Sequence, residues 1–221
     1  MPHPKGGYKI DGKPGPGVTT IIGRFKDSGG LLHWAFGQGR LCERGEINSL
    51  YDNRDKAADA GTLAHAMVEA CISKTEFKPP ADTPDEILQQ AEQGFKNFLS
   101  WEENNLLTIT NQEEMLLSTE HKFGGCIDGA GLDTSARRCL IDWKTGSGLY
   151  VDYLLQMAAY GILWDENYPD DKIKGGYHLC RFSKENADFH HHFFFNLDDA
   201  KEYFILLRKA YDLDKKLKKR I

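Results

Sequence analysis

The spacing of apolar residues changes along the chain from that of helices to that of strands, and this change limits the possible folds. Three segments of the first half carry apolar residues at helical spacing: 31–50, 54–73 and 87–104. After them the spacing becomes that of strands, in five segments: 113–119, 124–133, 139–144, 177–182 and 189–195. Helical spacing returns between the third and fourth strands and again near the C-terminus, at 151–166 and 198–220. This order predicts an α/β domain built on a mixed sheet.

Composition bounds the class of protein. The 221 residues suit one domain, and 40% apolar with 28% charged residues is typical of a globular chain. No apolar stretch reaches the roughly 18 residues that a membrane span needs. Residues 1–17 are rich in glycine and proline and lack the apolar core of a signal peptide. We therefore expect an irregular start to the chain and an intracellular protein without membrane contact.

The five cysteines indicate no metal cluster. They are scattered along the chain and form no Cys-x-x-Cys pair, which argues against zinc ribbons and iron–sulfur clusters. We expect reduced thiols with mostly structural roles.

Only local features favour contact with nucleic acids, because the formal net charge is −5. Residues 208–221 contain seven Lys and Arg against two Asp, a local charge of +5, so the rest of the chain carries −10. This basic tail could contact phosphates. A solvated helix end, where lysines complement the helix dipole, explains it as well and is the commoner case. Tyr8 and Trp34 are candidates for stacking on a base, although packing is the commoner role of Trp34.

The segment CLIDWKTG, residues 139–146, places an acid and a lysine where an apolar strand ends. Side chains of a strand alternate between its faces, so Asp142 and Lys144 share one face and Trp143 points to the other. A short turn joins the preceding strand, whose antiparallel pairing would bring Asp128 towards Asp142. Two carboxylates and an ammonium suit a Mg²⁺ or Mn²⁺ site for phosphodiester cleavage. A surface ion pair is the alternative for the Asp-x-Lys motif alone.

Two pairs of residues on predicted helices flank this motif in the sequence. His65 and Glu69 are four residues apart and share a helix face, as do Gln156 and Tyr160. Each pair alone is more often a packing or surface feature than part of a site. Gly125, in the neighbouring strand, indicates a close approach of the backbone to another group.

Taken in order, the segments GTLAH, GGCID, LIDWKTG and QMAAY resemble the motif series of the PD-(D/E)XK nuclease superfamily. The similarity is greatest to its RecB-type branch, and within it to phage exonucleases and mitochondrial genome maintenance exonuclease. It extends over roughly residues 14–220 and includes PGVTTII and LLHWAF near the start. The resemblance implies a restriction-endonuclease-like α/β core, in which helices flank a central mixed sheet, plus an N-terminal helical segment. Residues 1–221 would form one nuclease domain, with His65 in its 1–110 part and the sheet core in 111–221.

The resemblance implies a catalytic set. Asp128 and Asp142 would ligate the metal, together with His65 and the backbone carbonyl of Trp143. Lys144 would be the catalytic lysine, which orients the attacking water or stabilises charge on the phosphate.

Further residues would contact the substrate. Gln156 and Tyr160 match a motif that supports the site and contacts DNA. Thr145 and Ser147 would bind phosphate, or else form a simple turn.

Two acids outside the central motif would support the site. Glu113 matches an acid that recurs at the start of the first strand. Its neighbour Glu114 competes for this role, because a slip of one residue moves a side chain to the other face of a strand. Glu69 would support the site or form a salt bridge.

The resemblance implies a DNA exonuclease that uses one or two Mg²⁺ or Mn²⁺ ions. It would act on single-stranded DNA or DNA ends in replication, recombination or repair, as an enzyme of phage or prophage type in the cytoplasm of a bacterial cell. No iron–sulfur cluster is expected, because no cysteine follows Cys180. The oligomeric state is open, with a monomer slightly favoured. The alternatives are a structure-specific endonuclease of the same fold, a catalytically dead nucleic-acid-binding module, and an unrelated α/β protein.

Overall fold

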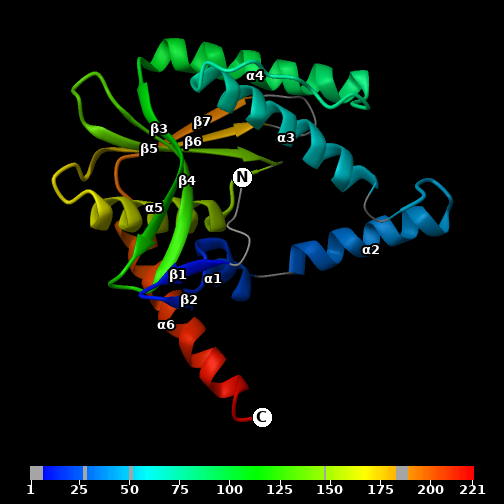
Figure 1. The fold of residues 1–221 in the computed structure, drawn as a ribbon. Coiled ribbons are helices and arrows are strands. Elements are labelled where there is room, and N and C mark those ends of the chain that lie inside the picture. Colours follow the sequence, from blue (N-terminus) through cyan, green and yellow to red (C-terminus); the bar gives the residue numbers. More distant parts are fainter. Residues whose placement is uncertain (1–6, 27–28, 50–51, 147, 183–188) are drawn as a thin grey trace.

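The computed structural model describes residues 7–26, 29–49, 52–146, 148–182 and 189–221 (Figure 1). A sheet of five strands in the order β3–β4–β5–β6–β7 lies at its centre. Its strands are β3 (Thr108–Ser118), β4 (Phe123–Leu132), β5 (Arg138–Thr145), β6 (Ile173–Phe182) and β7 (Phe189–Phe194). Neighbouring strands are antiparallel except for the parallel pair β5–β6. The mixed sheet flanked by helices, predicted from the sequence, is confirmed.

One face of the sheet is covered by α5 (Val151–Asn167) and α6 (Asp198–Lys218). α5 connects β5 to β6, since two parallel strands need a crossover connection. It packs closely because Gly161 has no side chain: a Cβ there would lie 2.5 Å from the Tyr177 hydroxyl oxygen on β6. Leu140, Ile127 and Phe204 are among the residues buried between these helices and the sheet.

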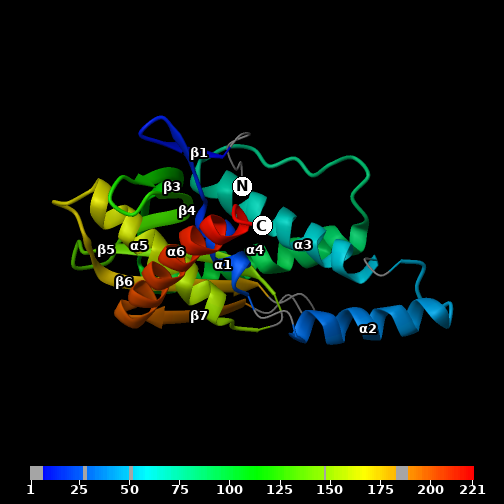
Figure 2. The ribbon, with the colours of Figure 1, turned by 90° about the horizontal axis from the view of Figure 1, so that it is seen from below.

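The other face is covered by α3 (Asp52–Ile72) and α4 (Asp85–Asn105), which pack against each other (Figure 1). Phe98 and Trp101 of α4 pack against Ile141 and Trp143 of β5. α2 (Gly29–Glu43) lies to the side of the sheet in both views (Figures 1 and 2). It ends earlier than the predicted 31–50 segment. Gly45, at φ 72°, adopts the left-handed conformation that often follows a helix end.

The N-terminal region is more ordered than the sequence predicts. β1 (Tyr8–Ile10) and β2 (Lys13–Gly15) form a hairpin, followed by α1 (Val18–Arg24). Asp11 and Gly12 at its turn have φ values of 49° and 74°, as a type I′ turn requires. The expectation of an irregular segment is therefore wrong for residues 8–15.

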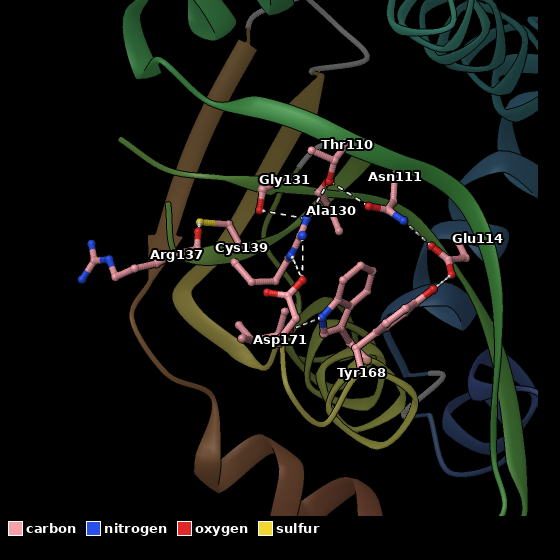
Figure 3. A network of polar contacts seen from close by, with 12 residues as sticks. Thr110, Asn111, Glu114, Ala130, Gly131, Arg137, Cys139, Tyr168 and Asp171 are labelled. Carbon is pink, nitrogen blue, oxygen red and sulfur yellow. Dashed lines mark hydrogen bonds and ion pairs between the residues drawn. The ribbon is translucent and has the colours of Figure 1, made fainter. Parts of the chain in front are cut away.

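A polar network at one end of the sheet links β3, β5 and the loop after α5 (Figure 3). The guanidinium of Arg138 donates to Asp171 over 2.9 Å and to the Thr110 hydroxyl over 2.6 Å. It also lies 5.0 Å from the centre of the Trp164 ring. Within the described part of the chain, no helix combines the length and apolar character that crossing a membrane requires.

Candidate active site

Three acidic residues lie in one row across neighbouring strands. The residues on either side of Glu113 in β3 are each paired with a residue of β4, and this register sets Glu113 opposite Asp128. The β4–β5 register ends at the pair Gly129–Ile141, and its next step sets Asp128 opposite Asp142. The strand pairing that buries the core therefore also gathers the three carboxylates.

Lys144 lies against two of these acids. Its Nζ is 2.5 Å from Asp142 Oδ2 and 3.7 Å from Asp128 Oδ2. Trp143 points to the opposite face, where its ring lies 6.2 Å from that of Phe98, while its backbone N–H donates to Asp128 Oδ2 over 3.1 Å. The convergence expected from strand alternation is thus present, and the catalytic roles of these residues stay a prediction.

The two aspartates are buried to an unusual degree for acids. Each is only 1% exposed. Among the described residues, neither Asp128 Oδ1 nor Asp142 Oδ1 has a hydrogen-bond partner. Buried carboxylate oxygens are normally paired, because desolvation of the charge is costly. These two oxygens therefore suit a cation.

His65 of α3 joins the row from the side of the helices. Its Nε2 lies 4.0 Å from Glu113 Oε1, and ligand atoms of His65, Glu113 and Asp128 lie within 4.8 Å of one another. Asp142 is not in this trio. Glu69 is exposed and forms no ion pair with the described residues, so the salt bridge considered for it is absent there.

Burial sets the electrostatics of the site. It raises the pKa of Asp142 to about 7, against the attraction of Lys144. Burial, followed by the Asp128 charge, also raises the pKa of Glu113. It lowers the pKa of His65, which favours the neutral imidazole. For Lys144 burial lowers the pKa, but the two aspartates more than offset it and the net shift is upwards.

The structure distinguishes Glu113 from Glu114. Glu113 faces His65, and the Cys126 thiol lies 3.7 Å from its Oε2. Glu114 belongs to the network of Figure 3, where it accepts hydrogen bonds from the Tyr168 hydroxyl and from Asn111. Glu113 has a φ of 49°, a strained value for a residue other than glycine.

Gln156 and Tyr160 of α5 are joined by a hydrogen bond of 2.7 Å from the Gln156 amide to the tyrosine oxygen. Both are buried, at 9% and 4% exposed. A Cβ at Gly125 would lie 2.8 Å from the Tyr160 ring, so the close approach expected at this glycine is helix packing. Burial, and next the charge of Asp128, raise the pKa of Tyr160 well above its usual value.

Sequence reasoning missed two neighbours of Lys144. The Tyr153 ring centre lies 5.8 Å from its ammonium, and Arg181 donates to the Gly146 carbonyl over 2.6 Å. Tyr153 lies one helical turn before the predicted Gln156, a spacing that could have indicated it. Ser147 and the side chain of Thr145 lie outside the described residues, so their phosphate contacts stay a prediction.

Comparisons with known proteins found similar solved structures and no similar sequence. No protein-family model matches the sequence, and no curated protein is significantly similar to it. One similar solved structure is the "Putative exonuclease" from Eubacterium rectale, with a TM-score of 0.48 and 10% identity over 68% of this chain. The chain spans 64% of the length of that protein. Another is an alkaline exonuclease from Laribacter hongkongensis, with a TM-score of 0.34 and 12% identity over 75% of this chain and 92% of that one.

Proposed function

We propose that the protein is a metal-dependent DNA exonuclease. The observation that carries this proposal is the buried row of Glu113, Asp128 and Asp142, with Lys144 against two of its members and His65 beside the third. A structural ion pair needs one acid for one base. Two acids against one lysine, with a third acid beside His65, leave negative charge buried, which is costly unless a cation is bound.

The donor set fits a divalent cation. Carboxylate oxygens suit Mg²⁺ and Mn²⁺, and an imidazole suits transition ions more than Mg²⁺. His65, Glu113 and Asp128 would form the first ligand set, since their ligand atoms lie within 4.8 Å of one another. Asp142, with an unpartnered oxygen of its own, and the Trp143 carbonyl are further proposed ligands. When bound, the cation would acidify a water molecule and neutralise charge on the scissile phosphate.

The protein groups supply the remaining chemistry. Lys144 keeps its proton because its pKa is raised, so it acts as a hydrogen-bond donor to water or phosphate and not as a base. His65 offers a neutral nitrogen because burial lowers its pKa. Gln156 and Tyr160 are buried, and we assign them a positioning role beneath the site, with any DNA contact confined to their exposed edge.

The biological setting belongs to the same proposal. The motif resemblance supports a phage-type enzyme of DNA replication, recombination or repair, which acts on single-stranded DNA or DNA ends in the bacterial cytoplasm. We treat residues 1–221 as one nuclease domain that works as a monomer.

Cleavage of end-labelled single-stranded DNA in Mg²⁺ or Mn²⁺ tests the proposal. We expect cleavage by the wild type, none in EDTA, and a loss of at least about a thousandfold in Lys144→Ala, which removes the charge that positions the reaction. Lys172→Ala, at an exposed lysine in the loop between α5 and β6, is the matched control. Absence of metal-dependent cleavage by the wild type would contradict the proposal. Cleavage of circular single strands, which have no ends, would show that the protein is an endonuclease and not an exonuclease.

A further inference from the structure

Three adjoining cavities run along one side of α6. Their volumes are about 330, 390 and 480 Å³, and Tyr211 and Lys215 of α6 line all three. The opposite wall comes from residues 7–24, which contain the β1–β2 hairpin and α1. α1 and α6 are in contact and lie side by side when the molecule is viewed from below (Figure 2). We call this feature the α6 groove; its walls are residues 7–24, Lys122 and six residues of α6, namely Arg208, Tyr211, Asp212, Asp214, Lys215 and Lys218.

The groove is basic although the protein is acidic. Three acids line it, Asp11, Asp212 and Asp214. Six cations line it: Lys13, Arg24, Lys122, Arg208, Lys215 and Lys218. The groove thus carries an excess of positive charge in a chain whose net charge is −5.

Internal pairing leaves two of these cations available. Each of the three acids is already held: Asp11 by Lys122 at 2.5 Å, Asp212 by Arg208 at 2.6 Å, and Asp214 by Arg24 at 2.7 Å and Lys218 at 3.5 Å.

Lys13 and Lys215 are exposed, and neither forms an ion pair with another described residue. The two lysines lie on opposite walls, Lys13 on β2 and Lys215 on α6. An anion in the groove would be attracted by both ammonium groups.

The other polar groups of the groove suit a nucleotide strand. Thr19 and Thr20 present exposed hydroxyls on the α1 side. Tyr211 lines all three cavities; its ring is partly buried against the core, and its centre lies 5.9 Å from the Arg208 guanidinium carbon. Ammonium groups that follow a backbone, combined with an aromatic surface for bases, are the usual means of binding single strands.

β4 connects one wall of the groove to the candidate active site. The backbone N–H of Gly124 donates to the Pro16 carbonyl over 3.1 Å. Tyr8 lines the first cavity, and a Cβ at Gly124 would lie 2.4 Å from its ring. Gly124 is four residues before Asp128, roughly 13 Å along a strand. Tyr8 is only 5% exposed, so it forms a wall of the groove and is not the exposed stacking residue expected from the sequence.

We propose that the α6 groove binds the phosphate backbone of single-stranded DNA next to the candidate active site. This inference rests on the proposed function, since it gives the cleaved strand a path. Lys13 and Lys215 contact phosphates, and Tyr211 offers a surface for a base. Within the basic tail of the sequence, this proposal gives Lys215 a role in DNA binding. Arg208 has a structural role, because it is 7% exposed and donates to the Lys122 carbonyl over 3.0 Å.

Binding without cleavage tests the groove separately from catalysis. Fluorescence anisotropy would measure the Kd of a labelled 20-nucleotide single strand in Ca²⁺, as a function of salt, for the full chain. The groove variant is Lys13→Glu with Lys215→Glu. Its matched control, Lys172→Glu with Lys209→Glu, changes the net charge equally at exposed lysines outside the groove, one of them on α6. Thermal unfolding of each variant checks that it is folded.

We expect the groove variant to raise Kd at least about tenfold and to reduce the salt slope by about 1.4, the value for two phosphate contacts of a single strand. The control should change Kd less than about threefold, through long-range charge alone. If the two variants raise Kd equally, the groove is not the DNA-binding surface. The proposal would also be wrong if an acidic peptide competed for the groove as well as DNA does, because the groove would then be a peptide-binding site. Wild-type cleavage in Mg²⁺ is scored separately, so a failure of the proposed function is distinguishable from a failure of the groove.

Discussion

Replacement of His178 by asparagine should change how the stability of the protein depends on pH. His178 of β6 is 7% exposed and lies between Trp101 of α4 and His191 of β7. Its Nδ1 is 2.9 Å from Nε2 of His191, and the two rings stack. Burial, and then the nearby His191, lower the pKa of His178 to about 4.

The sign follows from the direction of this shift. The unfolded chain binds a proton at His178 near pH 6.5, whereas the folded chain binds it only near pH 4. Between these values the unfolded state holds more protons, so stability falls as the pH drops. A shift from 6.5 to about 4 corresponds to a loss of about 2.5 kcal/mol between pH 7 and pH 4.5.

Urea unfolding at pH 7 and pH 4.5 measures this difference. The His178→Asn variant loses packing at both pH values, but its loss of stability between them should be smaller than that of the wild type by about 2 kcal/mol. His190→Asn, at an exposed histidine of β7, is the control and should keep the wild-type difference. An unchanged pH dependence in His178→Asn would refute the assigned cause.

Three further predictions concern the site. Glu113→Gln should abolish metal-dependent cleavage and weaken Mn²⁺ binding in calorimetry. Glu114→Gln should mainly lower the unfolding free energy, by about 1–3 kcal/mol, because the amide nitrogen that replaces one oxygen cannot accept the hydrogen bond made there; the reverse pattern would refute the assignment of the two acids. Lys144→Met should lower the free energy of unfolding of the metal-free protein by about 3–5 kcal/mol, because the buried carboxylates lose their counter-charge. Added Mn²⁺ should recover part of this loss in thermal melts. An equal melting temperature of the variant with and without Mn²⁺ would count against the metal site. Gly125→Ala should cost about 1–3 kcal/mol in urea unfolding, since its Cβ would meet the Tyr160 ring at 2.8 Å, and a wild-type midpoint would show that this packing yields easily.

The sequence allowed the centre of the site to be predicted, because a strand has a fixed period. Alternation alone sets Asp142 and Lys144 on one face and Trp143 on the other, and one short turn brings Asp128 to them. Neither step depends on the rest of the fold. The roles of these residues still await the cleavage assay.

Other features needed information that the sequence did not supply. The choice between Glu113 and Glu114 depends on the strained φ of Glu113 and on a partner, Tyr168, more than fifty residues away. The β1–β2 hairpin did have a local signal, since Asp-Gly is a preferred type I′ turn, but the surrounding prolines and glycines favoured an irregular segment. The α6 groove joins residues 7–24 to the last helix, a contact that no local pattern indicates.

The row of acids across β3, β4 and β5 has a consequence for how the chain tolerates insertions and deletions. Each carboxylate lies in the row only because its strand is paired in this register. A shift of one residue would move every side chain of a strand to the other face of the sheet. Asp133 fixes the turn between β4 and β5 by accepting backbone hydrogen bonds from Ser135 and Arg137, each 2.9 Å long. An insertion or deletion between Asp133 and Arg137 would break these hydrogen bonds. A single deletion inside either ladder would separate the three carboxylates although all three residues would still be present in the sequence.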